Sequence, residues 1–579
     1  MRFASLASLK ELTLSHNKFD PVSPAVMRNI GSLEKLNMEF CKFANSKVSC
    51  AAGMLAIGKD DFALLPILWQ NLYLRLEKDL LVFSKPYLEK ICVKLNRIGQ
   101  GRGRYGQLIS LPRMKELNLS YSNMNSVRPI LLKNLDSLEK LGMHHCNLSK
   151  SPLRIESMAN LKELNFSYSK MDSASPVVIE SMNSLEEINM TFCKFDKFHL
   201  RLASLPSLKD LNFSHSKMGF ASPVVLESLD SLEKLNLESC KFDHSQLRLA
   251  SLPSLKELNL SRSKMAFASP VVVENLDSLK KLNMESCKFD HSQLRLASLP
   301  SLKELYLSRS KMAFASPVVV ENMDSLKKIN MESCKFDHSQ LRLASLPSLK
   351  ELNLSHSILD SAGAVVFKNL GSLVKLDMGY CHLSKSPLSL ASLPSLKELN
   401  LSCSKIDSAG LVVINNLDSL MKFDMSSCNL SKSPLRLASL PSLTELNLSD
   451  TKMDFASPVV IDNLDSLEKL DMRNFDFFKS SLSFDVLTNL KELDISSNKL
   501  DSDPLVGMEK LVLLEKLNLC SCDLNNLPFR LSSLAKLRDL NLSQNPLDPD
   551  TFDEIVKLES IEYLDLSRCQ LTKLPSKSV

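Results

Sequence analysis

Leucines recur along most of this chain at the first, fourth and sixth positions of a short motif, with polar residues between them. A clear copy has Leu255, Leu258 and Leu260, with Asn259 between the last two. In an extended segment, alternate side chains point to opposite sides, so the leucines face a core and the polar residues face solvent. Each copy therefore predicts a short β-strand that is buried on one face.

The copies of this motif recur with a constant period. One series starts at Met114 and the other at Leu138, and both return every 47 residues. The two series interleave at 24 and 23 residues, and with Leu9 and Leu33 they give 22 repeats. A period of this length is typical of solenoids, in which one repeat cannot bury its apolar face alone and neighbouring repeats stack to form the core. We therefore expect parallel strands stacked side by side.

The pattern LxxLxLxxN/C, as from Leu255 to Ser263, resembles that of the leucine-rich-repeat family, with intracellular-type repeats of 23 and 24 residues. The resemblance covers nearly the whole chain. It implies an α/β fold, a leucine-rich-repeat solenoid shaped like a curved horseshoe. A long parallel β-sheet would line the concave face, and short helices or 3₁₀ turns would line the convex face.

The segments between the strands differ between the two series. In the first series a Ser-Pro pair such as Ser269-Pro270 precedes apolar residues. Serine is a favoured helix N-cap and proline suits the first helical position, so we expect a short convex helix there. The same start recurs at Ser23, Ser175, Ser222, Ser316 and Ser457, and Asp503-Pro504 is equivalent. In the second series, segments such as 293–301 are interrupted by Ser and Pro, which favours turns or 3₁₀ segments.

The spacing breaks once, between Leu33 and Met114, where the excess equals one 47-residue pair plus 11 residues. We therefore expect leucine-rich repeats at 1–43, an irregular segment at 44–113 and a paired array at 114–579. The irregular segment fits a degenerate repeat pair, with strands at 86–93 and near Leu64, or a gene-model error. Its Gly/Arg-rich stretch at 99–106 favours a loop. Solenoid ends need polar caps, and neither end shows an obvious one, so we expect a fragment of a larger protein.

Composition and charge exclude several classes of protein. Hydrophobic residues make up 44% of the chain, which is enough for a core. The net charge of +5 comes from 71 basic and 66 acidic residues, a balance that does not favour a specific nucleic-acid partner. The start has no signal-peptide pattern, and the longest apolar stretch, 62–69, is far shorter than the roughly 20 residues that span a bilayer. We expect no membrane insertion.

Cysteines hold one fixed position of the second series. They are Cys41, Cys146, Cys193, Cys240, Cys287, Cys334, Cys381, Cys428, Cys522 and Cys569. Equivalent cysteines lie two rungs apart, about 10 Å, whereas a disulfide needs Cα atoms within about 7 Å. In the family this side chain points inward, so we expect buried free thiols. That favours a reducing compartment, and we expect the protein in the cytoplasm.

Motifs that would carry catalysis or metal binding are weak. The pairs Asp243-His244, Asp290-His291 and Asp337-His338 recur, but equivalent histidines should lie about 10 Å apart, whereas zinc needs ligand atoms at about 2 Å. Phosphate-binding loops and nucleophile-elbow motifs are absent from the sequence. We expect no enzyme activity, no cofactor and no metal.

The polar residues between the leucines form columns along the predicted concave face. From Asn165 to Asp565, Asn or Asp fills the central column except at Tyr306, and Lys-Glu pairs alternate with Lys-Lys pairs beside it. Residues 241–287 and 288–334 are copies that differ at three of 47 positions, one being Asn259 against Tyr306. The candidate partner-binding residues are His215, Lys256, Glu257, Asn259, Arg262, Lys280, Lys281, Lys303, Glu304, Tyr306, Arg309, Lys327, Lys328 and His356. This middle part of the array is locally basic.

These features favour a protein–protein interaction module or scaffold that binds a macromolecular partner on its concave face. The resemblance implies intracellular signalling or immune-type recognition. One alternative is a substrate-recruiting subunit of a ubiquitin-ligase-type complex, which would need an F-box or similar helical segment. Another is an extracellular receptor ectodomain, which would need a signal peptide and cysteine caps. A protein partner is expected, and the oligomeric state is left open.

Overall fold

In the computed structural model, the described residues cover most of 115–569 and, before residue 115, the backbone of short strands only. The larger gaps within 115–569 are at 122–129, 133–136, 149–152, 172–176, 196–199, 219–223, 244–246, 267–270, 289–293, 312–317, 337–340, 360–365, 384–389, 407–411, 431–434, 454–459, 476–483, 501–506 and 552–554. The chain forms two compact units, Met1–Pro300 and Ser301–Val579, and each is described by itself.

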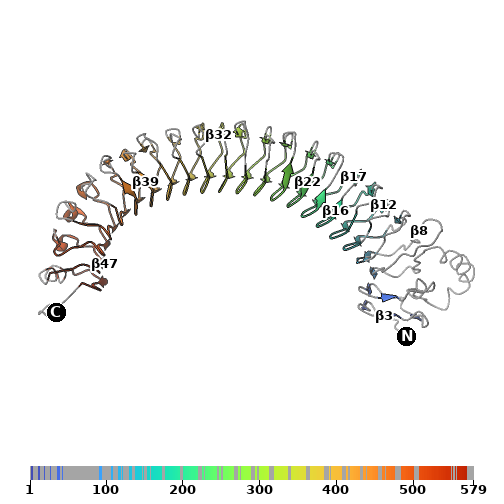
Figure 1. Ribbon diagram of the computed structural model, residues 1–579, viewed down its shortest axis with the longest axis horizontal. Helices are drawn as coiled ribbons and strands as arrows, with labels where there is room; N and C mark the ends of the chain where they lie inside the picture. Colours follow the sequence, from blue (N-terminus) through green and yellow to red (C-terminus); the bar gives the residue numbers. More distant parts are fainter. Residues whose placement is uncertain are drawn as a thin grey trace, which may run out of the picture. The chain divides into compact units, whose positions relative to one another are not determined.

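One parallel sheet, the main sheet, runs through the first unit, and Figure 1 shows its strands side by side. Its strands, in order, are β2 (Glu11–Thr13), β5 (Lys35–Met38), β7 (Lys90–Val93), β9 (Glu116–Asn118), β11 (Lys140–Gly142), β13 (Glu163–Asn165), β15 (Glu187–Asn189), β18 (Asp210–Asn212), β21 (Lys234–Asn236), β24 (Glu257–Asn259) and β27 (Lys281–Asn283). Each strand pairs in parallel with the next, so each repeat adds one strand to this sheet.

The second unit has a main sheet of the same kind. Its strands are β29 (Glu304–Tyr306), β31 (Lys328–Asn330), β33 (Glu351–Asn353), β35 (Lys375–Asp377), β36 (Glu398–Asn400), β38 (Lys422–Asp424), β41 (Glu445–Asn447), β44 (Lys469–Asp471), β45 (Glu492–Asp494), β46 (Lys516–Asn518), β47 (Asp539–Asn541) and β48 (Tyr563–Asp565). The register repeats without a slip, so equivalent residues of successive repeats lie opposite each other.

Leucines form the core, as the periodicity predicts. In β24, Leu258 is buried between the exposed Glu257 and the half-buried Asn259. The motif's other leucines, Leu255 and Leu260, are also buried. Burying a leucine side chain contributes roughly 1.5–3 kcal/mol, so the stacked repeats account for most of the stabilisation. The predicted solenoid with a long parallel sheet is confirmed.

A second ladder follows the turns after the main strands, where Cys and Ser alternate from Cys146 to Cys428 and Thr451, Phe475, Asn498 and Asn545 take some of the later positions. The Cys193 N–H donates to Ser216 Oγ (2.9 Å), and the Cys193 thiol donates to the carbonyl of Phe166 (3.1 Å). The Ser216 hydroxyl donates in turn to the carbonyl of Met190 (2.7 Å). These side chains therefore satisfy backbone groups that the turn leaves inside the core.

The predicted thiol ladder is confirmed in the described part of the chain, where its cysteines are buried and free. Cys41 lies outside the described residues. Burial raises the thiol pKa from the ordinary 9.0 to about 12 for the members from Cys193 to Cys428, and to about 11 for Cys522. A thiol with such a pKa stays protonated at neutral pH, which makes it a poor nucleophile.

The back of each unit carries strands where the sequence predicts helices. In the first series these are β14 (Val177–Glu180), β20 (Val224–Leu226), β26 (Val271–Val273), β30 (Val318–Glu321), β34 (Val366–Lys368), β37 (Val412–Ile414) and β43 (Val460–Asp462). They pair with second-series strands, which are β12 (Leu153–Glu156), β17 (Leu200–Ala203), β23 (Leu247–Leu249), β28 (Leu294–Leu296), β32 (Leu341–Ala344) and β40 (Leu435–Ala438). Two further strands, β8 (Gly106–Gln107) and β10 (Ile130–Leu132), belong to the same sheet as β12.

The prediction of short helices after the Ser-Pro pairs is therefore wrong for these repeats. Valine runs such as 271–273 favour strands because β-branched side chains are stiff and fit a pleated surface. The segments are also too short to offset the cost of helix nucleation. The Ser-Pro pairs at 175–176, 222–223, 269–270, 316–317 and 457–458 lie outside the described residues.

The turns or 3₁₀ segments expected in the second series are also strands in most repeats, as at Leu294–Leu296, so that expectation is wrong there. It is right near the end of the chain. Three such helices, η3 (Phe484–Val486), η5 (Met508–Lys510) and η6 (Leu531–Ser533), replace the back strands there. In the described part of the chain, no helix is both long enough and apolar enough to span a membrane.

Narrow lateral sheets complete the described elements. In the first unit β16 (Lys194–Phe195), β19 (Lys217–Met218), β22 (Lys241–Asp243) and β25 (Lys264–Ala266) follow the thiol ladder in register. In the second, β39 (Asn429–Leu430) pairs with β42 (Lys452–Met453). Near the start, β1 (Arg2–Phe3) pairs with β4 (Val26–Met27), and β3 (Lys18–Phe19) pairs with β6 (Lys42–Phe43).

The expected boundaries at 43 and 113 stay predictions. Within the irregular segment, β7 pairs with β5 on one side and β9 on the other, at the position expected for a strand in 86–93. Leu64 and residues 99–105 of the Gly/Arg-rich stretch lie outside the described residues.

Candidate functional site

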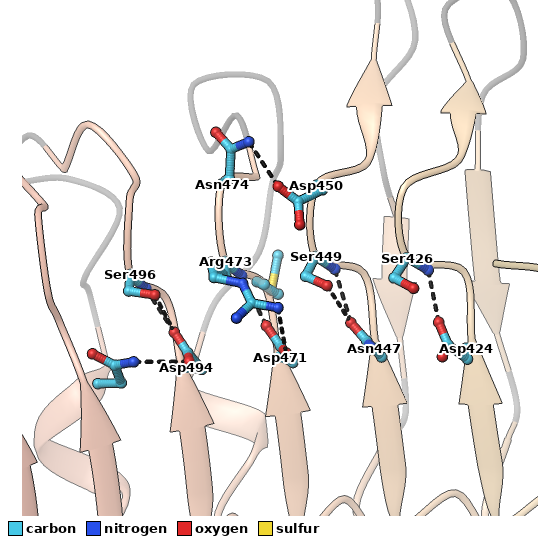
Figure 2. Close-up of polar contacts among 12 residues, drawn as sticks. Asp424, Ser426, Asn447, Ser449, Asp450, Asp471, Arg473, Asn474, Asp494 and Ser496 are labelled. Atoms are coloured by element: carbon cyan, nitrogen blue, oxygen red, sulfur yellow. Dashed lines mark hydrogen bonds and ion pairs between the residues drawn. The ribbon is translucent and has the colours of Figure 1, made fainter. Parts of the chain in front are cut away.

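The Asn and Asp side chains of the central column of the main sheet cap the turns that follow most of its strands; Gly142 and Tyr306 interrupt the column. In β24 the Asn259 Oδ1 accepts the backbone N–H of Ser261 (3.0 Å). Figure 2 shows the same arrangement in the second unit, where Asp424, Asn447 and Asp494 accept the backbone N–H groups of Ser426, Ser449 and Ser496. Asn and Asp favour this Asx turn because their side chains reach the backbone two residues on. These side chains are half-buried, and one face of each is occupied by the turn.

The residue three positions after each cap has a left-handed backbone. Arg262, for example, has φ 57, and its N–H donates to the carbonyl of Glu285 (2.7 Å) in the next repeat. Non-glycine residues seldom adopt this conformation, so the repeat structure imposes it. We call these positions the turn column. Its first-unit members are Tyr121, His145, Tyr168, Phe192, His215, Ser239, Arg262 and Ser286. Its second-unit members are Arg309, Ser333, His356, Tyr380, Cys403, Ser427, Asp450, Asn474, Ser497, Ser521, Gln544 and Arg568.

Aromatic rings of the turn column stack into a continuous ladder in the first unit. We call Tyr121, His145, Tyr168, Phe192 and His215 the ring ladder. Successive ring centroids are 4.5, 4.6, 4.6 and 4.5 Å apart, with interplanar angles of 8° or less. The rung spacing of about 4.8 Å is close to a ring-stacking distance, so identical backbone positions bring the rings face to face. In the second unit, His356 and Tyr380 stack at 4.4 Å.

The ring ladder is an exposed apolar feature on otherwise polar turns. Half of Tyr168 and 42% of Phe192 are accessible to solvent, although their ring faces are covered by their neighbours. The stacked rings leave their edges to solvent and hold one another in a single orientation. Large aromatic side chains with few rotatable bonds are enriched at the energetic centres of protein interfaces.

Charged residues at the start of the main strands pair between repeats. We call the residues just before each strand, such as Lys209, Glu233 and Lys256, the strand-start column. In it Lys256 Nζ lies 2.7 Å from Glu233, and Lys209 Nζ lies 3.0 Å from Glu186. Pairing with Lys256 lowers the pKa of Glu233. Exposed pairs of this kind contribute about 1 kcal/mol or less each. They therefore add little to the stability of the fold, but they fix which side chains lie next to each other on the surface.

Family comparison agrees with this geometry. The family model described as "Leucine-rich repeat region" matches residues 93–386, which is just over half of the 579-residue chain. A second model, "Leucine Rich repeat", matches 392–414 and 486–503. The chain belongs to the leucine-rich-repeat family. A search of curated proteins gave no match.

Solved leucine-rich-repeat structures resemble this chain only loosely. YopM from Yersinia enterocolitica is 19% identical with a TM-score of 0.41, over 83% of this chain and 90% of that one. A plant peptide hormone receptor, in complex with its peptide, is 16% identical with a TM-score of 0.39, over 97% and 96%. The functional domain of InlJ from Listeria monocytogenes, described as including a cysteine ladder, is 19% identical with a TM-score of 0.38, over 58% and 68%.

The predicted partner-binding residues of the first leucine-rich-repeat unit lie on neighbouring repeats. His215 is exposed and stacks on Phe192, and Arg262 lies 3.6 Å from Glu238. Exposed residues on β24 or at the start of β27 are Glu257, Lys280 and Lys281. The Lys256 side chain pairs with Glu233, and the Asn259 side chain caps the turn after its strand. These residues therefore share one surface, but several of them, such as Lys256 and Asn259, already interact with other residues of the repeat array.

The remaining predicted residues belong to the second leucine-rich-repeat unit. Lys303, Arg309, Lys327 and His356 are exposed, Lys328 pairs with Glu351 (2.9 Å), and the Tyr306 hydroxyl donates to Glu304 (3.1 Å). Tyr306 is half-buried, and burial together with Glu304 raises its pKa. The contribution of each residue to binding stays a prediction.

Sequence reasoning missed two members of the ring ladder. Comparison within the first series of the sequence places Tyr121, Tyr168 and His215 in one column, whereas His145 and Phe192 belong to the second series. The signal was present, since a ring lies three residues after the last strand residue in both series. Only the parallel register shows that the two series form one stack.

The Asp-His pairs at 243–244, 290–291 and 337–338 fall wholly or partly outside the described residues. Elsewhere in the described chain, no three His, Cys, Asp or Glu side chains are close enough together to hold a metal ion.

Proposed function

We propose that this chain is a protein-interaction module that receives a partner on the turn column and the exposed face of its main sheet. The observation that carries the proposal is the ring ladder. Five rings lie on consecutive repeats, four of them exposed and Tyr121 half-buried, and each is held by stacking at 4.5–4.6 Å. Binding to such a surface costs little side-chain entropy because the rings are already ordered.

The architecture supports a binding role over catalysis. A solenoid presents an extended surface of aligned side chains, and leucine-rich-repeat solenoids are typically non-enzymatic scaffolds. Polar residues of the turn column continue the ring ladder within the first unit, since Ser239, Arg262 and Ser286 follow His215. This gives an apolar segment beside a polar, charged one, which is the composition of interface core and rim.

We further propose a cytoplasmic setting, in signalling or immune-type recognition. The thiol ladder supports a reducing compartment, because its described members are free and cannot reach one another through the repeat. The partner's identity is left to experiment.

Affinity capture with matched variants tests the proposal. The full chain, immobilised, is exposed to an extract of its source cells, and captured proteins are identified by mass spectrometry. The double variant Tyr168→Ser and Phe192→Ser should lose at least tenfold of the specifically captured protein. Val512→Ser is the control, because Val512 is equally exposed, at 52%, but follows η5 instead of a main strand. Equal capture by both variants, with unchanged circular dichroism, would refute the proposal.

A further inference from the structure

Three lysines of the strand-start column lie on consecutive repeats of the second unit. We call Lys303, Lys327 and Lys350 the lysine run. The Lys327 N–H donates to the carbonyl of Lys303 (2.9 Å), and the Lys350 N–H donates to that of Lys327 (2.9 Å). Their backbones are therefore direct neighbours, at a rung spacing of about 4.8 Å, and all three side chains are exposed.

The lysine run departs from the charge pattern of its own column. Elsewhere in that column most lysines lie beside a glutamate that pairs with them, as Lys491 does with Glu468 (2.8 Å), although Lys280 and Lys397 have no glutamate at the adjacent positions of the column. In the first unit Glu233 lies between Lys209 and Lys256 and pairs with the latter. Lys327 holds the position equivalent to Glu233, so the alternating carboxylate is replaced by a third ammonium group.

Nearby carboxylates do not neutralise the run. Glu351 pairs with Lys328 (2.9 Å), and Glu304 accepts a hydrogen bond from the Tyr306 hydroxyl (3.1 Å). Asp324 is exposed on the turn before Lys327. Among the described residues, none of the three lysines of the run forms an ion pair, with Asp324 or with any other acid. Like charges on adjacent strands destabilise a sheet, so the run is a place where a bound anion would be favourable.

We propose that the lysine run binds an acidic segment of a polypeptide, which deepens the proposed function by naming the chemistry of one partner surface. Carboxylates on one side of an extended chain recur about every 6.8 Å, a spacing that flexible lysine side chains on 4.8 Å rungs can follow. The inference rests on the proposed role in protein binding, but it uses different residues from the ring ladder.

The surroundings favour a polypeptide over a nucleic acid. Single-stranded nucleic acid is usually held by several aromatic side chains on which bases stack. Tyr306 is the one aromatic residue on β29, β31 and β33.

Fluorescence anisotropy of the full chain with a labelled hexaglutamate peptide tests the inference. Hexaglutamine and a labelled six-nucleotide oligouridylate serve as comparison ligands. We expect hexaglutamate to bind more tightly than either, and its affinity to fall as salt rises from about 0.05 to 0.15 M, because exposed charges are screened. Lys327→Glu recreates the alternation seen at Glu233, so it should fold normally and weaken hexaglutamate binding at least fivefold.

Lys335→Glu is the matched control. Lys335 is exposed on the same repeat, beyond the thiol-ladder residue Cys334, and its substitution changes the net charge equally. Equal losses from Lys327→Glu and Lys335→Glu would overturn the proposal, as would absence of hexaglutamate binding or tighter binding of oligouridylate. Capture of a partner through the ring ladder would survive each of these results, whereas loss of that capture alone would refute only the proposed function.

Discussion

At the scale of single residues, the turns are where this fold is least tolerant. Repeats place a non-glycine residue at positive φ after each main strand, and neighbouring repeats hold that conformation by backbone hydrogen bonds. Gly507, before η5, is a stricter case. Its φ is 90, and a Cβ there would lie 2.6 Å from the backbone nitrogen of Asp485. Backbone at that distance cannot move aside without shifting the preceding repeat.

Gly507→Ala should therefore destabilise the protein by about 1–3 kcal/mol, through backbone strain and the clash with Asp485. Chemical denaturation followed by circular dichroism measures the loss. Gly371→Ala is the control, because a Cβ at Gly371 would meet nothing within 4 Å. A smaller loss for Gly507→Ala than for Gly371→Ala would contradict the structure.

Thiol reactivity should divide the cysteines by burial. In native protein, iodoacetamide at neutral pH should label the half-buried Cys403 and Cys520 well before Cys287 or Cys334, which are buried and have pKa values of about 12. Peptide mass spectrometry locates the labels, and labelling in denaturant gives the reference. Rapid native labelling of Cys287 would show that the ladder is open to solvent.

At the scale of elements, the sequence predicts the main strands well because their leucines alternate with polar residues and recur at a fixed period. Leu258 and its equivalents are buried where the pattern places them. The back strands were missed because a Ser-Pro start is a local signal, whereas the pairing of Val271–Val273 with Leu294–Leu296 depends on the adjacent repeat. The ring ladder could be predicted only in part for the same reason, because ring stacking depends on the residues of neighbouring repeats.

The caps of the main strands give a prediction at this scale. In Figure 2, Asn447 Oδ1 accepts both the N–H (3.0 Å) and the hydroxyl (2.8 Å) of Ser449. Asn447→Ala leaves these donors of the buried Ser449 without that acceptor, and should cost about 1–2 kcal/mol. Hydrogen exchange should show faster exchange at the Ser449 amide and little change two repeats away. Unchanged exchange there would mean that the cap does not stabilise the turn.

At the scale of the whole molecule, the thiol ladder makes stability depend on alkaline pH. Its thiol pKa values are raised from 9.0 to about 12 in the folded protein, so unfolded chains release these protons first as pH rises. The stability that comes from keeping these buried thiols protonated is fully present below pH 9 and is lost between pH 9 and 12. Each ladder cysteine from Cys193 to Cys428 contributes on the order of 1 kcal/mol per pH unit in that window.

The variant Cys287→Ala with Cys334→Ala isolates this effect from other groups that titrate in the same range. Its free energy of unfolding should fall less steeply between pH 9 and 11 than that of the parent chain. Parallel curves for the two proteins would contradict the assignment. Urea denaturation at each pH provides the measurement.

The central claim is that partners bind on the turn column and the face of the main sheet. Site-specific photo-crosslinking tests it most directly, with a photoreactive phenylalanine placed at Tyr168 or at Val512 in the full chain and irradiated in an extract of the source cells. We predict a discrete covalent adduct from position 168 and none from 512. An adduct from 512 alone, or from neither position, would contradict the claim.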